Sequence, residues 1–300
     1  MQEEYILYTI YFESMFIMKK SFVLTSALPS ATNNPDLFMK AVEKLSSFNV
    51  STVEFFCNFD LSCHYRYILE QYSMKGIFLA AAYQKKNGLS LCSVDESTRE
   101  TAVSATYRCF DAGKNAGADC VLITSGYYPG EKFEEKSWNK LKKSIRELSD
   151  AYPGMEITLE PGDRDIDAMQ LVGPTQQTVL WAKDIKKDIQ KFWLTMDTSH
   201  IAQLNENIYH SLEIANGLYH HIHLANCILE KTHPLFGDKH PMFGDPDAFY
   251  KLEEFKEIVK KIDEKSTDKF LVSIEIINRN KNEWEGFLSI LDEEAWFLNQ

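Results

Sequence analysis

The sequence predicts a single-domain (β/α)₈ barrel of the α/β class. From residue 21 onward, apolar strand-like runs alternate with helix-like segments, and there are eight such pairs. Regular alternation of this kind favours parallel strands joined by helices. Four of the apolar runs also stop on a carboxylate or an imidazole, which is typical of a barrel whose site lies at the carboxyl ends of its strands. An open, doubly wound sheet is the alternative architecture, and the count of eight favours the barrel.

Length and composition agree with one large domain. The 300 residues are 44% hydrophobic and 25% charged, and no linker rich in Pro, Gly or Ser divides them. We expect residues 1–20 to form an extension outside the fold and residues 21–300 to form the barrel. Residues 5–18 are rich in Tyr, Ile, Phe and Met, but they include Glu13 and are too few to cross a membrane as a helix. Acids precede them where a signal peptide would carry bases.

The predicted strands are short apolar runs that lie between turn residues. They cover residues 22–28, 52–57, 76–83, 119–126, 156–160, 192–200, 218–226 and 269–277. The run 192–200 reads FWLTMDTSH, an apolar strand that passes directly into Asp197 and His200. A strand covered on both faces needs this kind of continuous apolar sequence.

The predicted helices show apolar residues at helical spacing and recognisable ends. They cover residues 34–48, 61–72, 95–116, 133–152, a segment from 174, 205–215 and 282–297. Asn34 is expected to cap the first of them with Pro35 in its first turn, and Gly117 follows the long third helix. One connection is unusually long, the segment CILEKTHPLFGDKHPMFGDPD after the seventh strand. Its length, its aromatic residues and its imidazoles predict a functional loop.

Charge and cysteine content exclude some classes of protein. The formal net charge is −12 and basic runs are short, which argues against a nucleic-acid partner. The six cysteines are scattered without a CxxC pair, so we expect reduced thiols and a cytoplasmic protein. A small neutral molecule or a cation is a more natural partner for an acidic chain. We expect no membrane partner, and the sequence leaves a homo-oligomer open.

Four residues at strand ends form a candidate metal site. They are Glu160, Asp197, His223 and Glu275. If their strands are parallel and adjacent, their side chains meet at one rim of the barrel. Oxygen and imidazole ligands without thiolate suit Mn²⁺, Mg²⁺, Co²⁺ or Zn²⁺. Taken singly, each acid is as readily explained as a helix cap or a salt-bridge partner, but three acids that face one another need a counter-charge.

The remaining histidines are interpreted individually. His200 is expected to bind a substrate hydroxyl or a second ion, with a surface imidazole as the alternative. His221 has the same side-chain parity as His223 but lies one layer deeper, so we expect it to be packed or to support the ligands. In the long loop, Asp238 and His240 are expected to bind substrate or to complete a second metal site.

These residues resemble the xylose-isomerase-like TIM barrels, and within them the tagatose 3-epimerase and hydroxypyruvate isomerase type. The resemblance covers most of the chain and rests on the segments LEPGDRD, MDTSH, HIHLAN and SIEII. It implies that Glu160, Asp197, His223 and Glu275 bind one divalent ion, commonly Mn²⁺. It also implies that Glu160 and Glu275 act as the acid/base pair, through an enediolate held by the ion, and that His200 contacts substrate. The basic residue that epimerases place shortly after the histidine of the seventh strand is absent from HIHLANCIL.

A more distant resemblance links the chain to endonuclease IV, an abasic-site nuclease with three zinc ions. Asp197, His200, His223 and the Asp238/His240 pair resemble its ligands. That enzyme also needs histidines at the ends of the third and fourth strands, where this chain reads AAAYQ and ITSGY. The acidic net charge further disfavours a nuclease.

The expected function is therefore a metal-dependent isomerase or epimerase of a small sugar or sugar phosphate. A dehydratase or lyase of an inosose-like cyclitol uses the same chemistry and is the nearest alternative. A barrel that binds a sugar without catalysis is a third, but a pure binding protein has no need of three converging acids.

Overall fold

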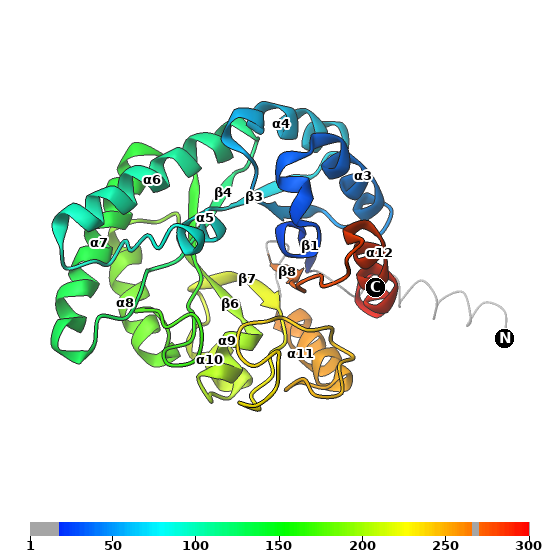
Figure 1. The fold of residues 1–300 in the computed structure, drawn as a ribbon. Helices are drawn as coiled ribbons and strands as arrows, with labels where there is room; N and C mark the ends of the chain where they lie inside the picture. Colours follow the sequence, from blue (N-terminus) through cyan, green and yellow to red (C-terminus); the bar gives the residue numbers. More distant parts are fainter. Residues whose placement is uncertain (1–17, 266–269, 300) are drawn as a thin grey trace, which may run out of the picture.

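Eight parallel strands close into a barrel in the computed structural model, which describes residues 18–265 and 270–299. Neighbours in the chain pair in order, and β1 pairs with β8 to complete the ring (Figure 1). The strands are β1 (Lys19–Val23), β2 (Thr52–Phe55), β3 (Lys75–Leu79), β4 (Cys120–Ile123), β5 (Glu156–Leu159), β6 (Phe192–Asp197), β7 (Tyr219–Leu224) and β8 (Leu271–Ile274). The predicted (β/α)₈ barrel is confirmed.

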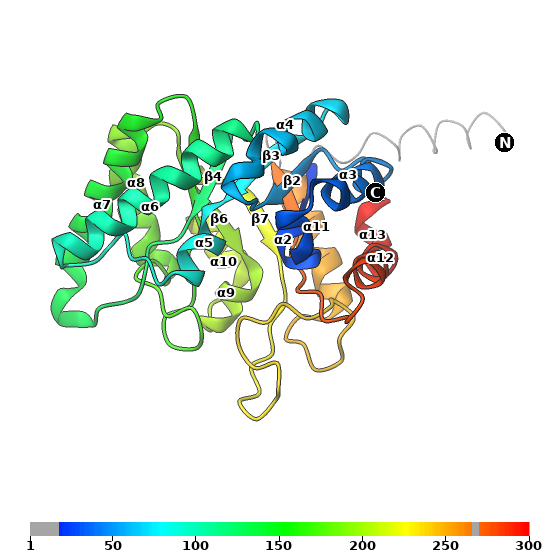
Figure 2. The ribbon, with the colours of Figure 1, turned by 45° about the horizontal axis from the view of Figure 1, so that its top comes forward.

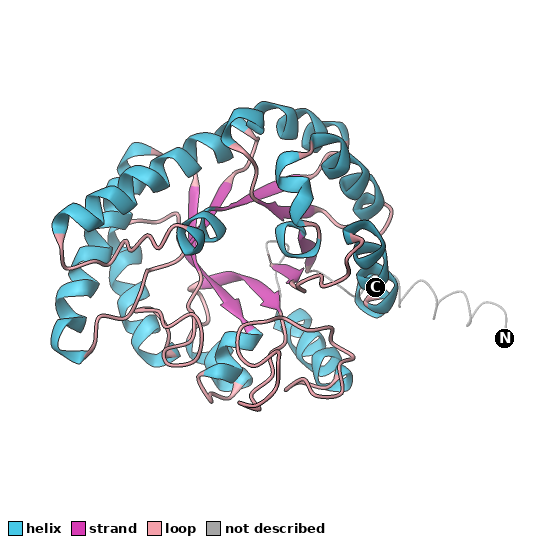
Figure 3. Cartoon of the chain, viewed as in Figure 1, coloured by secondary structure: helices cyan, strands magenta, loops and turns pink. Residues whose placement is uncertain are grey.

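Helices surround the ring of strands (Figure 3). The α-helices are α2 (Leu24–Ala27), α3 (Pro35–Ser46), α4 (Ser62–Gln71), α5 (Ala80–Lys86), α6 (Glu96–Asn115), α7 (Glu134–Ala151), α8 (Thr175–Asp188), α9 (Thr198–Gln203), α10 (Ile208–Ile214), α11 (Leu252–Lys265), α12 (Glu283–Glu293) and α13 (Ala295–Leu298). Short 3₁₀ turns are η1 (Pro29–Asn33), η2 (Phe59–Leu61) and η3 (Glu131–Phe133). No helix in these described ranges is both long and apolar enough to cross a membrane.

The two faces of each strand serve different purposes. Alternate side chains of β2 point to opposite sides, as the geometry of a strand requires. Phe55 points outward, where its ring lies 5.2 Å from that of Phe38 on α3 and 5.8 Å from that of Tyr65 on α4. Its neighbour Glu54 points into the barrel and is fully buried. The outer layer is thus a hydrophobic interface, while the interior accepts polar groups.

The first strand begins earlier than the sequence predicts. Lys19 and Lys20, which we expected in the extension, pair with Leu271 and Val272 of β8. Met18 is buried against the core. Residues 1–17, the rest of the predicted extension, lie outside the described part of the chain.

Three strands end sooner than predicted and pass into helical turns. The predicted strand 192–200 stops at Asp197, and Thr198–Gln203 forms α9. The predicted strand 22–28 stops at Val23, and Leu24–Ala27 forms α2. The predicted strand 76–83 stops at Leu79, and Ala80–Lys86 forms α5. An apolar run does not by itself distinguish a strand from a buried helix, and the three alanines of α5 favour helix. Lys269, the predicted start of the last strand, lies outside the described residues.

The long loop between β7 and α11 extends beyond the strands, as the yellow segment at the bottom of Figure 2 shows. Phe243 in this loop is hydrogen-bonded to Glu294, which lies between α12 and α13. The Glu294 carboxylate accepts hydrogen bonds from Phe243 N at 3.3 Å and from Trp296 Nε1 at 2.8 Å. Glu294 is nearly fully buried, and this burial raises the pKa of its carboxyl to about 7.

We expect Glu294 to make stability fall as pH rises from about 4.5 to about 7. The pKa of Glu294 is higher in the folded than in the unfolded chain. Its contribution to the free energy of unfolding is therefore complete at pH values below the unfolded pKa, and it is lost as pH rises through the folded pKa. At about 1.4 kcal/mol per pKa unit, the loss is on the order of 3 kcal/mol. Urea unfolding at several pH values measures it. Glu294→Gln should remove this part of the pH dependence, whereas the exposed control Glu285→Gln should retain it. Equal pH profiles for Glu294→Gln and wild type would contradict the assignment.

Candidate metal centre

Four side chains from consecutive strands meet inside one end of the barrel. Asp197 and His223 lie in β6 and β7 and face each other in the strand register, while Glu160 and Glu275 directly follow β5 and β8. One donor atom from each of the four lies within 4.8 Å of those of the others. These are the four residues that the sequence predicts to converge.

His223 lies at the centre of this group. Its Nδ1 atom is 2.8 Å from Glu160 Oε1 and 2.8 Å from Glu275 Oε2. Asp197 Oδ2 lies at 3.8 Å from the same nitrogen. Burial disfavours the charged imidazolium, but the surrounding carboxylates outweigh it and raise the pKa of His223 well above its usual value.

Asp197 combines a structural and a site role through its two oxygens. Oδ1 accepts hydrogen bonds from Ser199 N at 2.6 Å and His200 N at 3.1 Å, which caps α9. Oδ2 is buried and has no hydrogen-bond partner among the described residues. Burial, together with Glu160 and Glu275, raises the pKa of Asp197. Asp197 can therefore cap α9 with one oxygen and still offer the other to a metal ion.

The donor set fits a divalent cation. Three carboxylates converge on one imidazole, and a buried carboxylate oxygen without a partner is costly. A cation would satisfy the free oxygen of Asp197 and offset the mutual repulsion of the acids. Oxygen ligands with one imidazole suit Mn²⁺, Mg²⁺, Co²⁺ or Zn²⁺, and they offer no thiolate to select a softer metal.

Glu275 is held in its ionised form. Burial raises the pKa of its carboxyl, but the charges of His240 and His223 lower it by more, so that the pKa is about 2. Ser26 Oγ donates a hydrogen bond to Glu275 Oε1 at 3.1 Å. Ser26 belongs to α2, so the early end of the first strand supplies a contact to the site.

The long loop brings Asp238 and His240 to the same region. His240 Nδ1 lies 3.7 Å from Glu275 Oε1, and its Nε2 atom contacts Asp238 Oδ1. His200 Nε2 lies 3.9 Å from Asp238 Oδ1, which places His200 beside the loop. His200 and His240 are both buried, and each has an Nδ1 atom without a hydrogen-bond partner among the described residues. The structure thus gathers the predicted substrate-binding residues, although their ligand atoms do not form a metal-like group with one another.

A cavity of about 210 Å³ lies beside Asp238. Its polar lining includes Gln84, Lys85, Thr124, Gln170 and Asp238. Lys85, on α5, donates a hydrogen bond to Asp238 Oδ2 at 3.2 Å. The lining thus presents amide, hydroxyl and charged groups of both signs.

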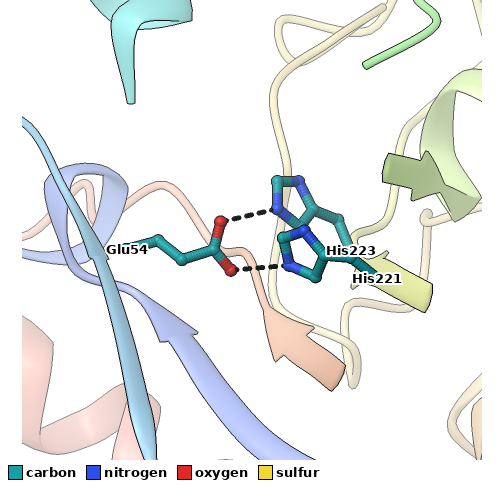
Figure 4. A group of neighbouring side chains, drawn as sticks. All are labelled: Glu54, His221 and His223. Atoms are coloured by element: carbon teal, nitrogen blue, oxygen red, sulfur yellow. Dashed lines mark hydrogen bonds and ion pairs between the residues drawn. The ribbon is translucent and has the colours of Figure 1, made fainter. Parts of the chain in front are cut away.

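Sequence reasoning missed two residues in this region. Lys85 lies in a segment expected to follow a longer strand, so its position on a helix beside Asp238 was not foreseen. Glu54 lies on β2 and contacts His221 and His223 across the barrel (Figure 4). Its one available signal was a single charged residue inside the apolar run TVEFFC. His221 is buried and hydrogen-bonded, as expected for a supporting residue.

The fold and the four converging donors define a (β/α)₈ protein with a candidate metal centre at the carboxyl ends of its strands. The model of the xylose isomerase-like TIM barrel family matches residues 42–297. The chain belongs to this family. No curated protein matches the sequence at a significant level.

Solved structures with the same fold include sugar epimerases and an AP endonuclease. A D-tagatose 3-epimerase-like protein superposes with a TM-score of 0.66 at 19% identity, covering 94% of this chain and 98% of that one. The D-psicose 3-epimerase of Clostridium cellulolyticum H10 gives 0.62 at 14% identity, covering 94% and 96%. A family 2 AP endonuclease from Brucella melitensis gives 0.64 at 15% identity, covering 94% and 98%. At these identities the likeness concerns the fold.

Proposed function

We propose that the protein is a divalent-metal-dependent isomerase or epimerase of a small sugar or sugar phosphate. The observation that carries the proposal is the placement of Glu160 and Glu275, each 2.8 Å from the same nitrogen of His223. Both carboxylates are thereby held next to one candidate metal ligand. The occurrence of sugar epimerases among proteins of the same fold agrees with this reading.

The chemistry follows from the positions of these two acids. Glu160 and Glu275 exchange a proton at a carbon beside a carbonyl, one acid removing it and the other returning it. A bound divalent ion supplies positive charge that stabilises the negative oxygen formed when the proton leaves. Glu160, Asp197, His223 and Glu275 would hold one such ion, and Mn²⁺ is the first to test.

Substrate contacts are assigned to residues beside the candidate metal centre. His200, Asp238 and His240 are proposed to hold substrate hydroxyl groups, since all three lie beside the candidate metal centre. Lys85 would place a positive charge at the cavity beside Asp238. The polar lining supports a small-molecule partner with several hydroxyl groups.

Two alternatives are less well supported. A cyclitol dehydratase would remove the same kind of proton and then expel hydroxide, so the product distinguishes it. An abasic-site nuclease would need a basic surface that binds the phosphates of DNA, and the net charge of −12 disfavours such a surface. The segments after β3 and β4 also place no histidine in the described cavity.

The decisive experiment is solvent exchange with a panel of ketoses in deuterated water. After loading with Mn²⁺, the enzyme is expected to introduce deuterium at the carbon beside the carbonyl of one panel member, because Glu160 and Glu275 exchange protons with solvent. Mass spectrometry and NMR measure the label and the product. Chelated protein is the control and should show none. Loss of water from a cyclitol would favour the dehydratase, and failure to exchange any ketose or cyclitol would overturn the proposal.

A further inference from the structure

A buried glutamate on β2 has no place in the proposed chemistry. Glu54 is fully buried, and its neighbours Val53 and Phe55 are apolar. It does not belong to the four-donor group at the strand ends. Burying a carboxylate is costly unless strong hydrogen bonds offset the lost hydration. The partners of Glu54 therefore need an explanation.

The Glu54 carboxylate faces two imidazoles of β7 (Figure 4). Oε2 lies 3.0 Å from Nε2 of His223, and Oε1 lies 3.0 Å from Nε2 of His221. The other ring nitrogen of His223, Nδ1, faces Glu160 and Glu275. One imidazole thus bridges the candidate metal centre and a carboxylate deeper in the barrel.

The groups around Glu54 form a closed hydrogen-bond network. Ser21 Oγ donates to Glu54 Oε1 at 3.2 Å. His221 Nε2 is 2.9 Å from Ser273 Oγ, and its Nδ1 atom is 3.0 Å from Thr195 Oγ1. Within the described chain, no side-chain polar atom of Glu54, His221 or His223 is without a partner, in contrast to Asp197 Oδ2. Hydrogen bonds explain this group without an ion of its own.

We propose that Glu54 is a positioning residue for the metal ligand His223. It accepts the N–H at Nε2, which fixes the ring orientation and the tautomer and leaves the Nδ1 lone pair directed at the site of the ion. A negatively charged acceptor also makes the ligating nitrogen a better donor. Ser21 and His221 hold the carboxylate in place, and Ser273 in turn contacts His221. The inference rests on the metal site proposed above and adds to it a residue that does not touch the ion.

The test is the metal affinity of Glu54→Gln in the absence of substrate. An amide has no charge and one acceptor oxygen instead of two, so it cannot serve both imidazoles as the carboxylate does. We expect Mn²⁺ affinity by calorimetry to fall about 10- to 100-fold. We also expect the absorption spectrum of the Co²⁺-loaded variant to change. Glu294→Gln is the matched control, since it alters an equally buried glutamate outside the network and should bind as wild type does. An unchanged affinity and spectrum in a folded Glu54→Gln would overturn the inference.

A second measurement needs no variant and covers the case in which Glu54→Gln does not fold. In the Zn²⁺-loaded wild type with ¹⁵N-labelled histidine, NMR should show Nδ1 of His223 bound to metal and Nε2 protonated. Metal on Nε2 would overturn the inference, as would a second ion bound through Glu54. If the wild type binds no divalent ion, the proposed function fails. If it binds one and only Glu54 proves dispensable, the inference alone fails.

Discussion

Solvent exchange by Glu275→Gln is expected to fall by about 10²- to 10⁴-fold relative to wild type, the range of a general base. His240 and His223 lower the pKa of Glu275 to about 2 despite its burial, so at neutral pH its carboxylate is ionised, as a general base must be. Glutamine has nearly the same shape but cannot accept the proton. The measurement is deuterium incorporation at saturating Mn²⁺, so that a weaker ion affinity does not account for the loss.

The control for this substitution is Glu230→Gln. Glu230 is exposed on the same connection between β7 and α11, and its side chain bonds to Thr232. It should exchange at the wild-type rate. If Glu275→Gln retained full exchange, Glu275 would not be the base, and Glu160 would have to serve alone.

Mn²⁺ is expected to stabilise the folded protein strongly. At 100 times its dissociation constant, an ion that binds only the folded state raises the free energy of unfolding by about 2.7 kcal/mol. Asp197→Asn should lose most of this increase, because it removes the charge of a carboxylate whose Oδ2 has no hydrogen-bond partner among the described residues. Asparagine is a good helix cap, so the metal-free variant should keep α9. Thermal and urea unfolding with and without Mn²⁺ measure both effects.

The matched control is Asp95→Asn. Asp95 caps α6 by accepting a hydrogen bond from Thr98 N at 2.8 Å, and it is not one of the four donors. The same substitution there should leave the response to Mn²⁺ intact. A full response in Asp197→Asn would remove Asp197 from the ligand set, and no response in the wild type would argue against a metal centre.

Much of the candidate site could be predicted because its residues lie at the ends of predicted strands. Glu160, Asp197, His223 and Glu275 each lie at or next to the end of an apolar run, and parallel strands in a closed barrel bring such ends to one rim. The residue types then limit the chemistry to oxygen and imidazole ligands.

The contact between Glu54 and His223 could not be predicted from the sequence. Its partner His223 lies 169 residues further along the chain and comes from a strand on another side of the ring. A charged residue inside an apolar run is equally consistent with an edge position or an outward-facing salt bridge. Only the closed ring decides that Glu54 and His223 face each other.

The predicted ends of β1 and β3 were wrong for a similar reason. Apolar continuity predicted strands over 22–28 and 76–83, but both runs contain a strand followed by a helical turn. The turn of α2 brings Ser26 to Glu275, and α5 carries Lys85 to Asp238. Contacts of this kind, made after the strand ends, are not encoded by periodicity.

By itself, the sequence determined the (β/α)₈ fold and the four donors at its rim, because hydrophobic alternation and the position of a residue at a strand end are local properties. The tertiary structure decided which atoms meet: the free oxygen of Asp197, the two faces of His223 and the carboxylate of Glu54. These depend on side-chain direction and on the closure of the barrel, and both are set by packing between distant strands.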